Sequence, residues 1–404
     1  MEIAIVGGGI IAQTLALRLG TRGHDVCIIA PDEAPHMAST GNAGTIAAYA
    51  VDPVGTPDVL RDLPHLLLDR LSPLALHRPS ILGLTPWLLR FLRQSLPGAA
   101  QANRAVLADL LSDAVSEWRD LAHSIGGADL MRSNGAVYAY DSAPALDAGR
   151  AAMQRRQAHG VTVEMLDQAE LAALEPGLPA GRFVGGALFS DTYWMKDPAQ
   201  MLAHVAAAHS APRIAARVTG VARAGAGWSL RLDNGETAQA QVVIVAAGAW
   251  SMQLLRPLGL RIPLTAERGY HLEFDMQDAR LPVQRPVSPV SLGFYLCPMA
   301  GRLRVAGTVE LGGIDAPPSP HRWDRLEDGV RAILPDLPAV SRRWMGLRPS
   351  IPDSLPVIGQ AQPGLFVAFG HGHLGLTLAP RTARIIDDAL AGRAAPAALR
   401  PDRF

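Results

Sequence analysis

The chain has 404 residues, and its 37 Lys and Arg balance its 37 Asp and Glu, so the formal net charge at pH 7 is zero. This length suits two domains, or one domain with a large insertion, and the balanced charge excludes an electrostatic case for binding nucleic acid or an acidic partner. Two distant cysteines, Cys27 and Cys297, exclude a disulfide framework and a cysteine metal cluster and indicate a reduced, cytoplasmic protein.

The first thirty residues predict a strand, a helix and a second strand. Residues 2–6 suit a buried strand, residues 10–22 repeat apolar side chains at helical spacing, and residues 24–30 suit the second strand. No basic segment precedes the first strand, so we expect no secretory signal. No apolar run approaches the ~20 residues needed to cross a bilayer.

The turn between the first strand and the helix carries a G-x-G-x-x-A motif. Gly7 permits the tight turn, Gly9 lets a pyrophosphate approach the backbone, and Ala12 lets helix and strand pack closely. The helix N-terminus then offers free N–H groups to phosphates. Glycine-rich turns also open helices that bind nothing, but the place between a strand and a helix favours dinucleotide binding.

Two features near this motif are ambiguous. The dinucleotide pattern has an acid at the end of the second strand, where this chain has Ala30. Asp32 and Glu33 lie just beyond, and the sequence does not show that either one reaches a ribose. The small and polar residues 39–44 suit a loop that donates hydrogen bonds to phosphate, and they equally suit an ordinary helix cap and turn.

The rest of the chain alternates helical and strand patterns. The expected helices are 63–76, 87–93, 106–125, 144–159, 167–174 and 197–209, and the expected strands are 135–140, 215–222, 227–233, 238–246, 264–274, 287–299, 303–309 and 365–369. The helix over 87–93 has an apolar face with arginines opposite, which suits packing on a second domain and also suits a lid or a membrane-docking element. The run over 242–250 is apolar and ends in small residues, as in a central parallel strand that leads the chain to a ligand.

A second glycine-rich turn closes the chain. Residues 370–377 follow the strand over 365–369 and lead into a helix that runs to Leu390. The start of this helix would present free N–H groups to an electron-rich ligand, although a tightly packed helix start also needs small residues.

These motifs, in this order, resemble the D-amino-acid oxidase and glycine oxidase superfamily of FAD-dependent oxidoreductases. The resemblance rests on the first βαβ unit and on the segments 39–44, 247–250, 268–270, 346–349 and 370–372. Segment 42–44 and an insertion over 73–95 make the chain most similar to bacterial D-amino-acid dehydrogenases. The resemblance implies an α/β fold: a three-layer ββα, Rossmann-like FAD domain with an inserted α+β substrate domain on an antiparallel sheet. The FAD domain is expected at 1–50, 130–140, 160–260 and 340–404, and the substrate domain at 51–129, 141–159 and 261–339.

The resemblance also implies which residues bind FAD, held non-covalently. The glycine-rich turn would follow the pyrophosphate, the loop after it would hold phosphate and line the flavin ring, a strand backbone would meet the adenine, and the closing turn would lie at the N1–C2=O edge of the flavin. The implied residues are Gly7, Gly9, Ile10, Ile11, Ser39, Thr40, Asn42, Ala43, Gly44, Val218, Ala247, Gly248, Gly372, His373, Leu374, Gly375, Leu376 and Thr377.

Arg348 matches the arginine that pairs the substrate carboxylate in this superfamily, and its planar fork suits a carboxylate as a lysine does not. Tyr295 resembles a tyrosine that shares the carboxylate. Tyr270 and Tyr49 are weaker candidates, and each equally suits a core tyrosine; His371 and His373 are candidates for the pocket lining and equally suit hydrogen-bonded loop residues. No spacing of His, Cys, Asp or Glu suggests a metal site.

The implied reaction is hydride transfer from the amine-bearing carbon of an amino acid, in particular a D-amino acid, to flavin N5. The substrate amine would enter neutral, and the imino acid would hydrolyse to a 2-oxo acid and ammonia. A secondary amine such as D-proline, hydroxyproline, sarcosine, glycine or an opine suits the same machinery, as does a flavin subunit of a larger dehydrogenase. The electron acceptor would be oxygen or a membrane quinone, and peripheral contact with the inner face of the membrane stays open.

Overall fold

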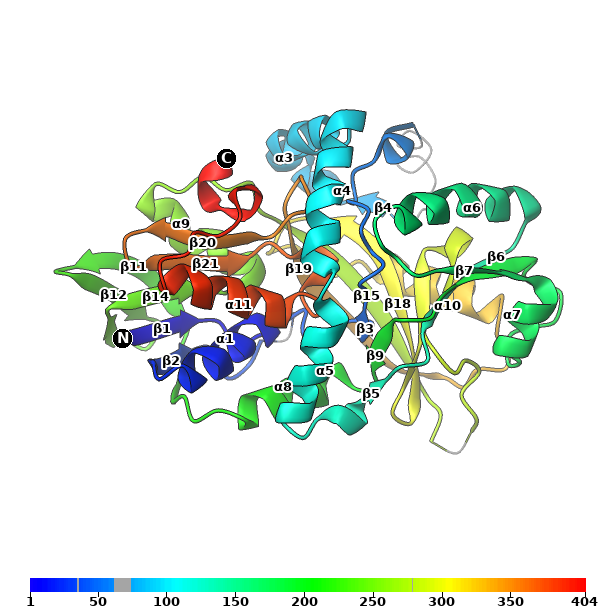
Figure 1. Ribbon diagram of the computed structural model, residues 1–404, viewed down its shortest axis with the longest axis horizontal. Coiled ribbons are helices and arrows are strands. Elements are labelled where there is room, and N and C mark those ends of the chain that lie inside the picture. Colours follow the sequence, from blue (N-terminus) through cyan, green and yellow to red (C-terminus); the bar gives the residue numbers. More distant parts are fainter. Residues whose placement is uncertain (35, 62–73, 278) are drawn as a thin grey trace.

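The computed structural model describes residues 1–34, 36–61, 74–277 and 279–404, and Figure 1 shows two halves side by side. Both ends of the chain lie in the same half, which is built on a parallel sheet. The strands of this sheet, in spatial order, are β10 (Arg213–Ile214), β2 (Asp25–Ile29), β1 (Glu2–Val6), β14 (Val242–Val245), β21 (Leu365–Phe369) and β20 (Val357–Gln362). Only β20, at one edge, runs antiparallel to its neighbour β21.

The parallel sheet is the middle of three layers. Helices α1 (Ile10–Thr21) and α11 (Ala379–Leu390) cover one face. The other face packs on an antiparallel sheet of β11 (Val218–Ala224), β12 (Gly227–Leu232) and β13 (Thr237–Ala240). Alternate residues of β1 supply the two cores, since successive strand side chains point to opposite faces. The predicted three-layer ββα fold is confirmed.

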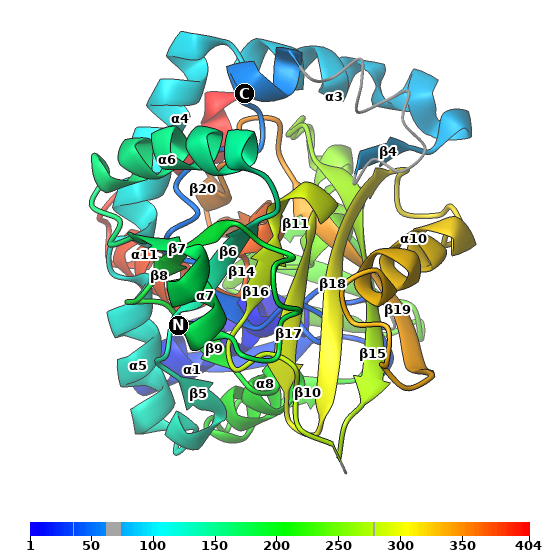
Figure 2. The same cartoon turned by 90° about the vertical axis from the view of Figure 1, so that its right-hand side faces the viewer.

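The second half is built on a large mixed sheet. Its strands in order are β19 (Val340–Ser350), β15 (Thr265–Asp275), β18 (Arg302–Leu311), β17 (Phe294–Met299), β16 (Val287–Pro289), β6 (Ala136–Tyr140), β8 (Gly185–Phe189) and β7 (Glu164–Asp167), with β4 (Leu74–Leu76) beside β18. Most pairs are antiparallel, as predicted for the inserted domain; the pairs β16–β6 and β18–β4 are parallel. Figure 2 shows α10 (Pro320–Arg331) against this sheet.

The two faces of this large sheet have different neighbours. On β15, Tyr270, Leu272 and Phe274 enter the core that includes residues of α10. The alternate residues Glu267, Gly269 and His271 face the other way, and His271 contacts the first half through the carbonyl oxygen of Gly41. Because strand side chains alternate, one face of the large sheet packs against α10 and the other face turns toward the first half of the molecule.

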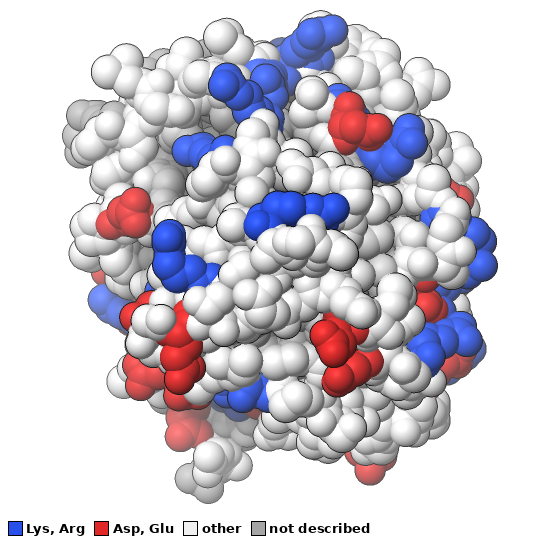
Figure 3. Space-filling model, turned by 90° about the vertical axis from the view of Figure 1, so that its left-hand side faces the viewer, with Lys and Arg blue, Asp and Glu red and all other residues white. Residues whose placement is uncertain are grey.

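The remaining elements complete the two halves. A small sheet joins β3 (Thr45–Ile46), β9 (Tyr193–Met195) and β5 (Met131–Arg132), and the helices are α3 (Ile81–Gln94), α4 (Pro97–Leu111), α5 (Ala114–Ser124), α6 (Ala143–Gln157), α7 (Gln168–Leu174), α8 (Pro198–Ala207) and α9 (Ser251–Leu255). None of the helices in the described part of the chain combines the length and the apolar character needed to cross a membrane. Figure 3 shows both signs of charge scattered over one end of the molecule.

Several elements differ from the predicted ones. Of the helix expected over 63–76, residues 62–73 lie outside the described residues, and 74–76 form strand β4. The helix expected over 106–125 lies within two helices, α4 and α5, and the strand expected over 238–246 is divided into β13 and β14. Helix α11 begins at Ala379, after a short 3-10 turn at 372–374, because Gly370 and Gly372 adopt left-handed backbone conformations that an α-helix cannot contain.

The division between the halves also differs from the predicted boundaries. Strands β6, β7, β8 and β19 belong to the large sheet, although their segments were expected with the FAD domain. Helices α4 and α5 were expected with the substrate domain, yet Leu107 and Leu110 join the core of the first half, and the indole N–H of Trp118 donates to the carbonyl oxygen of Leu376 at 2.7 Å. Such membership depends on contacts between distant segments, which local sequence patterns do not encode.

Candidate active site

A cavity of about 830 Å³ lies where the two halves meet. Its walls are the glycine-rich turn after β1, the loop over 36–44, the end of β14, the closing turn after β21, and the face of the large sheet that carries Gly269 and Arg348. Both glycine-rich turns therefore reach the same chamber, together with the predicted carboxylate-binding arginine.

The first turn is shaped for close approach. Gly7 has a φ of +131°, and a Cβ atom there would collide with the carbonyl oxygen of Ala246. A Cβ atom on Gly9 would lie 3.0 Å from the Ser39 hydroxyl. No larger residue fits at Gly7 without moving the backbone of the end of β14, so the turn stays open toward the chamber.

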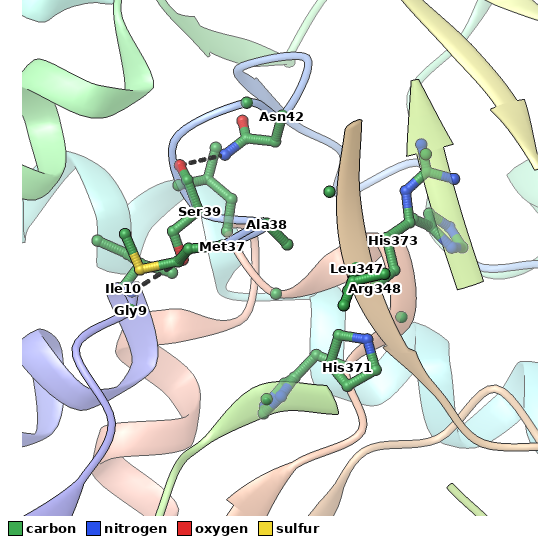
Figure 4. Close-up of a pocket in the computed structure, with 18 of the residues that line it drawn as sticks. Gly9, Ile10, Met37, Ala38, Ser39, Asn42, Leu347, Arg348, His371 and His373 are labelled. Carbon is green, nitrogen blue, oxygen red and sulfur yellow. Dashed lines mark hydrogen bonds between the residues drawn. The ribbon is translucent and has the colours of Figure 1, made fainter. Parts of the chain in front are cut away.

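Ser39 caps the first helix. The backbone N–H of Ile10 donates to Oγ of Ser39 at 3.0 Å, as Figure 4 shows. Its hydroxyl thus satisfies one of the unpaired N–H groups of the helix start, which was the structural alternative for this loop. The Thr40 hydroxyl donates to the carbonyl oxygen of Met37 at 3.1 Å, and Thr40 does not line the chamber.

The loop at 41–44 is fixed from within and from the large sheet. The Asn42 side chain donates to the carbonyl oxygen of Ser39 and accepts from the N–H of Gly44, each at 2.8 Å. Nη1 of Arg304 donates to the carbonyl oxygen of Asn42 at 2.6 Å, and Glu273 holds this arginine in turn. Burial opposes the charge on Glu273, but Arg304 outweighs it and holds the pKa of the carboxyl below its usual value. The loop is therefore a rigid wall of the chamber.

Most of the predicted cofactor residues line this one chamber. They are Gly7, Gly9, Ile10, Ile11, Ser39, Asn42, Ala43, Gly44, Val218, Ala247, Gly248, Gly372, His373, Gly375 and Leu376. Three do not: Thr40 as described, Leu374, which is buried in the core, and Thr377, whose hydroxyl accepts from the N–H of Ala47 at 3.0 Å. The collected residues surround a volume of about 830 Å³, which has room for a dinucleotide.

The two acids beyond β2 have different surroundings. Glu33 lines the chamber, whereas Asp32 lies 3.1 Å from Nη2 of Arg213 and does not line it. Ala30 itself is buried, close to Gly8. Glu33 is therefore the acid placed to meet ribose hydroxyls, one of the two that the sequence left open.

Arg348 enters the chamber from β19 and forms an ion pair there. Its Nη1 lies 2.8 Å from Oε1 of Glu267, and Ser350 donates to the other carboxylate oxygen at 3.0 Å. The guanidinium lies flat on Gly269, where a Cβ atom would come within 2.5 Å of Cζ. About a quarter of the arginine side chain stays accessible, so it can still meet a ligand. Figure 4 shows Arg348 and His373 across the cavity from Ser39 and Asn42.

Three tyrosine hydroxyls that meet one another also belong to residues lining the chamber. Tyr295 donates to the hydroxyl of Tyr138 at 3.1 Å and lies 3.3 Å from that of Tyr49. Burial and the neighbouring tyrosines raise the pKa of Tyr295, and burial raises the pKa of Tyr49. The hydroxyls of Tyr295 and Tyr49 therefore stay protonated at physiological pH and act as hydrogen-bond groups.

Two other predicted catalytic residues have structural partners. Tyr270 points to the α10 face, where its hydroxyl donates to Glu310 at 2.5 Å and its ring meets Trp323 edge to face. Tyr270 is among the residues that line the chamber, but its hydroxyl also accepts from the N–H of Ser319 at 3.1 Å and is thus held on the α10 side of the sheet. His371 is 3% exposed and bonded to the Thr382 hydroxyl at 2.9 Å, and burial lowers its pKa to about 3. It is neutral at physiological pH, and it lines the chamber with its ring tied to Thr382.

An ionic group at the rim was not predicted. Asp52 accepts from Nε of Arg104 at 2.7 Å and from Nε of Arg156 at 2.9 Å. Burial opposes the charge on Asp52, but the two arginines outweigh it and hold the carboxyl pKa below its usual value. Asp52 and Arg156 line the chamber, and Asp52 also lines a second cavity of about 630 Å³. The sequence carries no local signal for this group, since its members come from three separate segments.

The comparisons with known proteins agree with this geometry. The family profile described as FAD dependent oxidoreductase matches residues 2–389. The chain belongs to this family. The structure fits the family's cofactor, because the Gly7 turn and the hydrogen-bonded 41–44 loop face one chamber of about 830 Å³, and the prediction of FAD is confirmed.

Relatives of this FAD-dependent oxidoreductase match over nearly its whole length. The protein named D-amino-acid oxidase from Bradyrhizobium diazoefficiens is 32% identical, over 99% of this chain and 97% of the relative. A D-amino acid dehydrogenase from Cereibacter sphaeroides is 30% identical, over 98% and 92%. The crystal structure of glycine oxidase from Geobacillus kaustophilus superposes with a TM-score of 0.78 at 22% identity, over 100% of this chain and 98% of that one, which confirms the fold.

Proposed function

We propose that this FAD-dependent oxidoreductase oxidises the C–N bond of an amino acid, with a D-amino acid as the favoured substrate. The observation that carries the proposal is the position of Arg348, which lies accessible on Gly269 in the chamber that both glycine-rich turns share. The names of the similar proteins, D-amino-acid oxidase and D-amino acid dehydrogenase, support the same reaction and stereochemistry.

In this proposal Arg348 holds the substrate carboxylate. A guanidinium donates two parallel hydrogen bonds to a carboxylate, which fixes both the position and the orientation of the amino acid. The Tyr295 hydroxyl donates to the same carboxylate or to the amine, since Tyr295 lines the chamber from strand β17 of the same sheet. The two contacts point the Cα–H bond toward the loop at 41–44, beside which the flavin ring is expected. The gain in rate comes from this fixed orientation of the substrate.

The bound FAD supplies a hydride acceptor at N5. The chain's own residues hold and orient the substrate in the chamber between the two halves. The turn at 370–377, which includes His373, carries backbone N–H groups near the expected edge of the flavin. Since helix α11 begins only at Ala379, these local N–H groups contribute more there than the helix dipole.

The test is the spectrum and the substrate profile of the purified protein. We expect flavin absorbance that is bleached anaerobically by D-amino acids, and steady reduction of an artificial dye by the isolated chain. Bleaching by N-alkyl amino acids or D-proline alone would move the assignment to a secondary amine. Dye reduction only after addition of a cell extract would indicate a subunit of a larger dehydrogenase. A flavin that no amino acid reduces would overturn the proposal. Comparison of oxygen with a soluble quinone identifies the acceptor.

A further inference from the structure

Strand β18 contains one extra residue where it borders the chamber. Arg268 pairs with Glu310 and Tyr270 pairs with Gly307, so two residues of β18, Thr308 and Val309, stand opposite Gly269. Thr308 has a φ of +56°, in the left-handed region. This conformation is rare for any residue with a side chain and a clear outlier for a β-branched one, and such outliers cluster at functional sites.

Packing does not explain why a threonine occupies this bulge. Glycine adopts a positive φ without strain, and glycines already stand at Gly307 and Gly269 around it. Thr308 is 2% exposed, and its hydroxyl has no hydrogen-bond partner among the described residues. The residue thus has a strained backbone and an unpaired buried hydroxyl, both of which oppose stability.

The position of the bulge relates it to Arg348. The guanidinium of Arg348 lies on Gly269, which is the residue directly across from the bulge. Residues opposite one another on paired strands have Cβ atoms about 5 Å apart. Thr308, Gly269 and Arg348 all line the same chamber. A group bound by Arg348 would therefore lie within reach of the Thr308 side chain.

We propose that the Thr308 hydroxyl donates a hydrogen bond to the substrate carboxylate that Arg348 holds. This inference rests on the proposed function and adds a specificity residue to it. A carboxylate offers about four lone-pair sites, and the guanidinium fork fills two of them. One rotation about χ1 brings the unpaired hydroxyl to a third. The bound carboxylate gives the Thr308 hydroxyl a hydrogen-bond partner, which explains why a threonine occupies this strained position.

Three variants of the FAD-loaded enzyme test the proposal. Thr308→Ser keeps the hydroxyl, Thr308→Val keeps the shape without it, and Thr308→Gly removes both the hydroxyl and the strain. The probes are the dissociation constant of benzoate, read from the flavin spectrum, the KM for a D-amino acid, and the thermal unfolding midpoint. We expect Thr308→Ser to bind benzoate within twofold of the wild type, and Thr308→Val and Thr308→Gly to bind it ~10-fold more weakly.

The stability readout separates a binding role from a structural one. We expect Thr308→Gly to raise the unfolding midpoint while it weakens benzoate binding. The control is Ser354→Gly: Ser354 is the other described non-glycine residue with a positive φ, and it does not line the chamber. This control should leave benzoate binding unchanged. If Thr308→Val and Thr308→Gly bind benzoate as the wild type does, the inference is wrong and the proposed function stands. If the wild type itself binds no carboxylate and oxidises no amino acid, both fail.

Discussion

Arg348 and Glu267 stand directly opposite each other on the paired strands β19 and β15, with Nη1 of the arginine 2.8 Å from Oε1 of the glutamate. The arginine side chain is 24% exposed and lines the chamber, whereas the glutamate side chain is 9% exposed and does not line it. A substrate carboxylate at Arg348 must therefore share the guanidinium with a carboxylate that the protein already provides.

Replacement of Arg348 tests the carboxylate site. We expect Arg348→Ala to raise the KM for the amino acid about 100-fold, because two hydrogen bonds to a charged group are lost, each worth about 1.5–3 kcal/mol. Arg348→Lys keeps the charge but not the fork and should recover only part of the loss. Arg343→Lys, on the outer part of the same strand beside Glu327, is the control. An unchanged KM in Arg348→Ala would show that the carboxylate binds elsewhere.

Replacement of Glu267 should act in the opposite direction. Glu267→Gln removes the competing negative charge but leaves an oxygen that accepts from Arg348, so we expect the KM to fall about fivefold, the equivalent of about 1 kcal/mol for a partly exposed pair. Steady-state kinetics at two salt concentrations measures this effect. Glu327→Gln, at a surface pair with Arg331, is the matched control. A rise in KM would instead mean that Glu267 holds Arg348 in its working orientation.

Substitutions of Tyr295 and Tyr270 are expected to differ in their effects on substrate binding and on the stability of the protein. Tyr295→Phe removes a hydroxyl from the chamber together with its hydrogen bond to Tyr138, so kcat/KM should fall about tenfold and the free energy of unfolding by about 1 kcal/mol. Tyr270→Phe removes a donor from the buried carboxylate of Glu310, so it should cost about 1–3 kcal/mol of stability and leave the KM unchanged. Kinetics and urea unfolding on both variants check this. A loss of substrate binding in Tyr270→Phe would contradict its assignment to the α10 face.

The contrast between these two tyrosines illustrates what the sequence predicts. The first βαβ unit and the closing turn were predictable because their signals are local: Gly7 and Gly9 between a strand and a helix, and small residues after a strand. Both tyrosines lie on strands that were predicted, yet their directions depend on which face of the sheet covers the chamber. That choice, like the pairing of Glu267 with Arg348 across 81 residues, is set by register and by packing between the halves.

The acids beyond β2 provide a test of cofactor binding. Glu33 lines the chamber, so Glu33→Gln should raise the dissociation constant of FAD about threefold to tenfold through weaker hydrogen bonds to the ribose. Asp32→Asn, next in sequence but paired with Arg213, should leave it unchanged. Titration of the apoprotein with FAD, followed by flavin fluorescence, measures both. Equal effects of the two substitutions would indicate that only the net charge near the site matters.

Two buried histidines should make the free energy of unfolding of the protein depend on pH. His371 and His271 are 3% and 1% exposed, and burial lowers the pKa of each to about 3. In the unfolded chain an imidazole binds its proton near pH 6.5, so between pH 6.5 and pH 3 the unfolded state carries more protons than the folded state. The free energy of unfolding therefore has its full value above pH 6.5. It falls as the pH decreases below 6.5, by up to ~1.4 kcal/mol per pH unit for each histidine.

His371→Asn isolates one of the two contributions. The variant loses a hydrogen bond to Thr382 and should be less stable at pH 7, but its stability should fall less steeply between pH 6 and pH 4.5, by about 1 kcal/mol per pH unit. Urea unfolding at a series of pH values measures the slope, and His123→Asn, at an exposed position, controls for the removal of a histidine as such. An unchanged slope in His371→Asn would mean that the imidazole is protonated in the folded state, which its burial beside the Thr382 hydroxyl argues against.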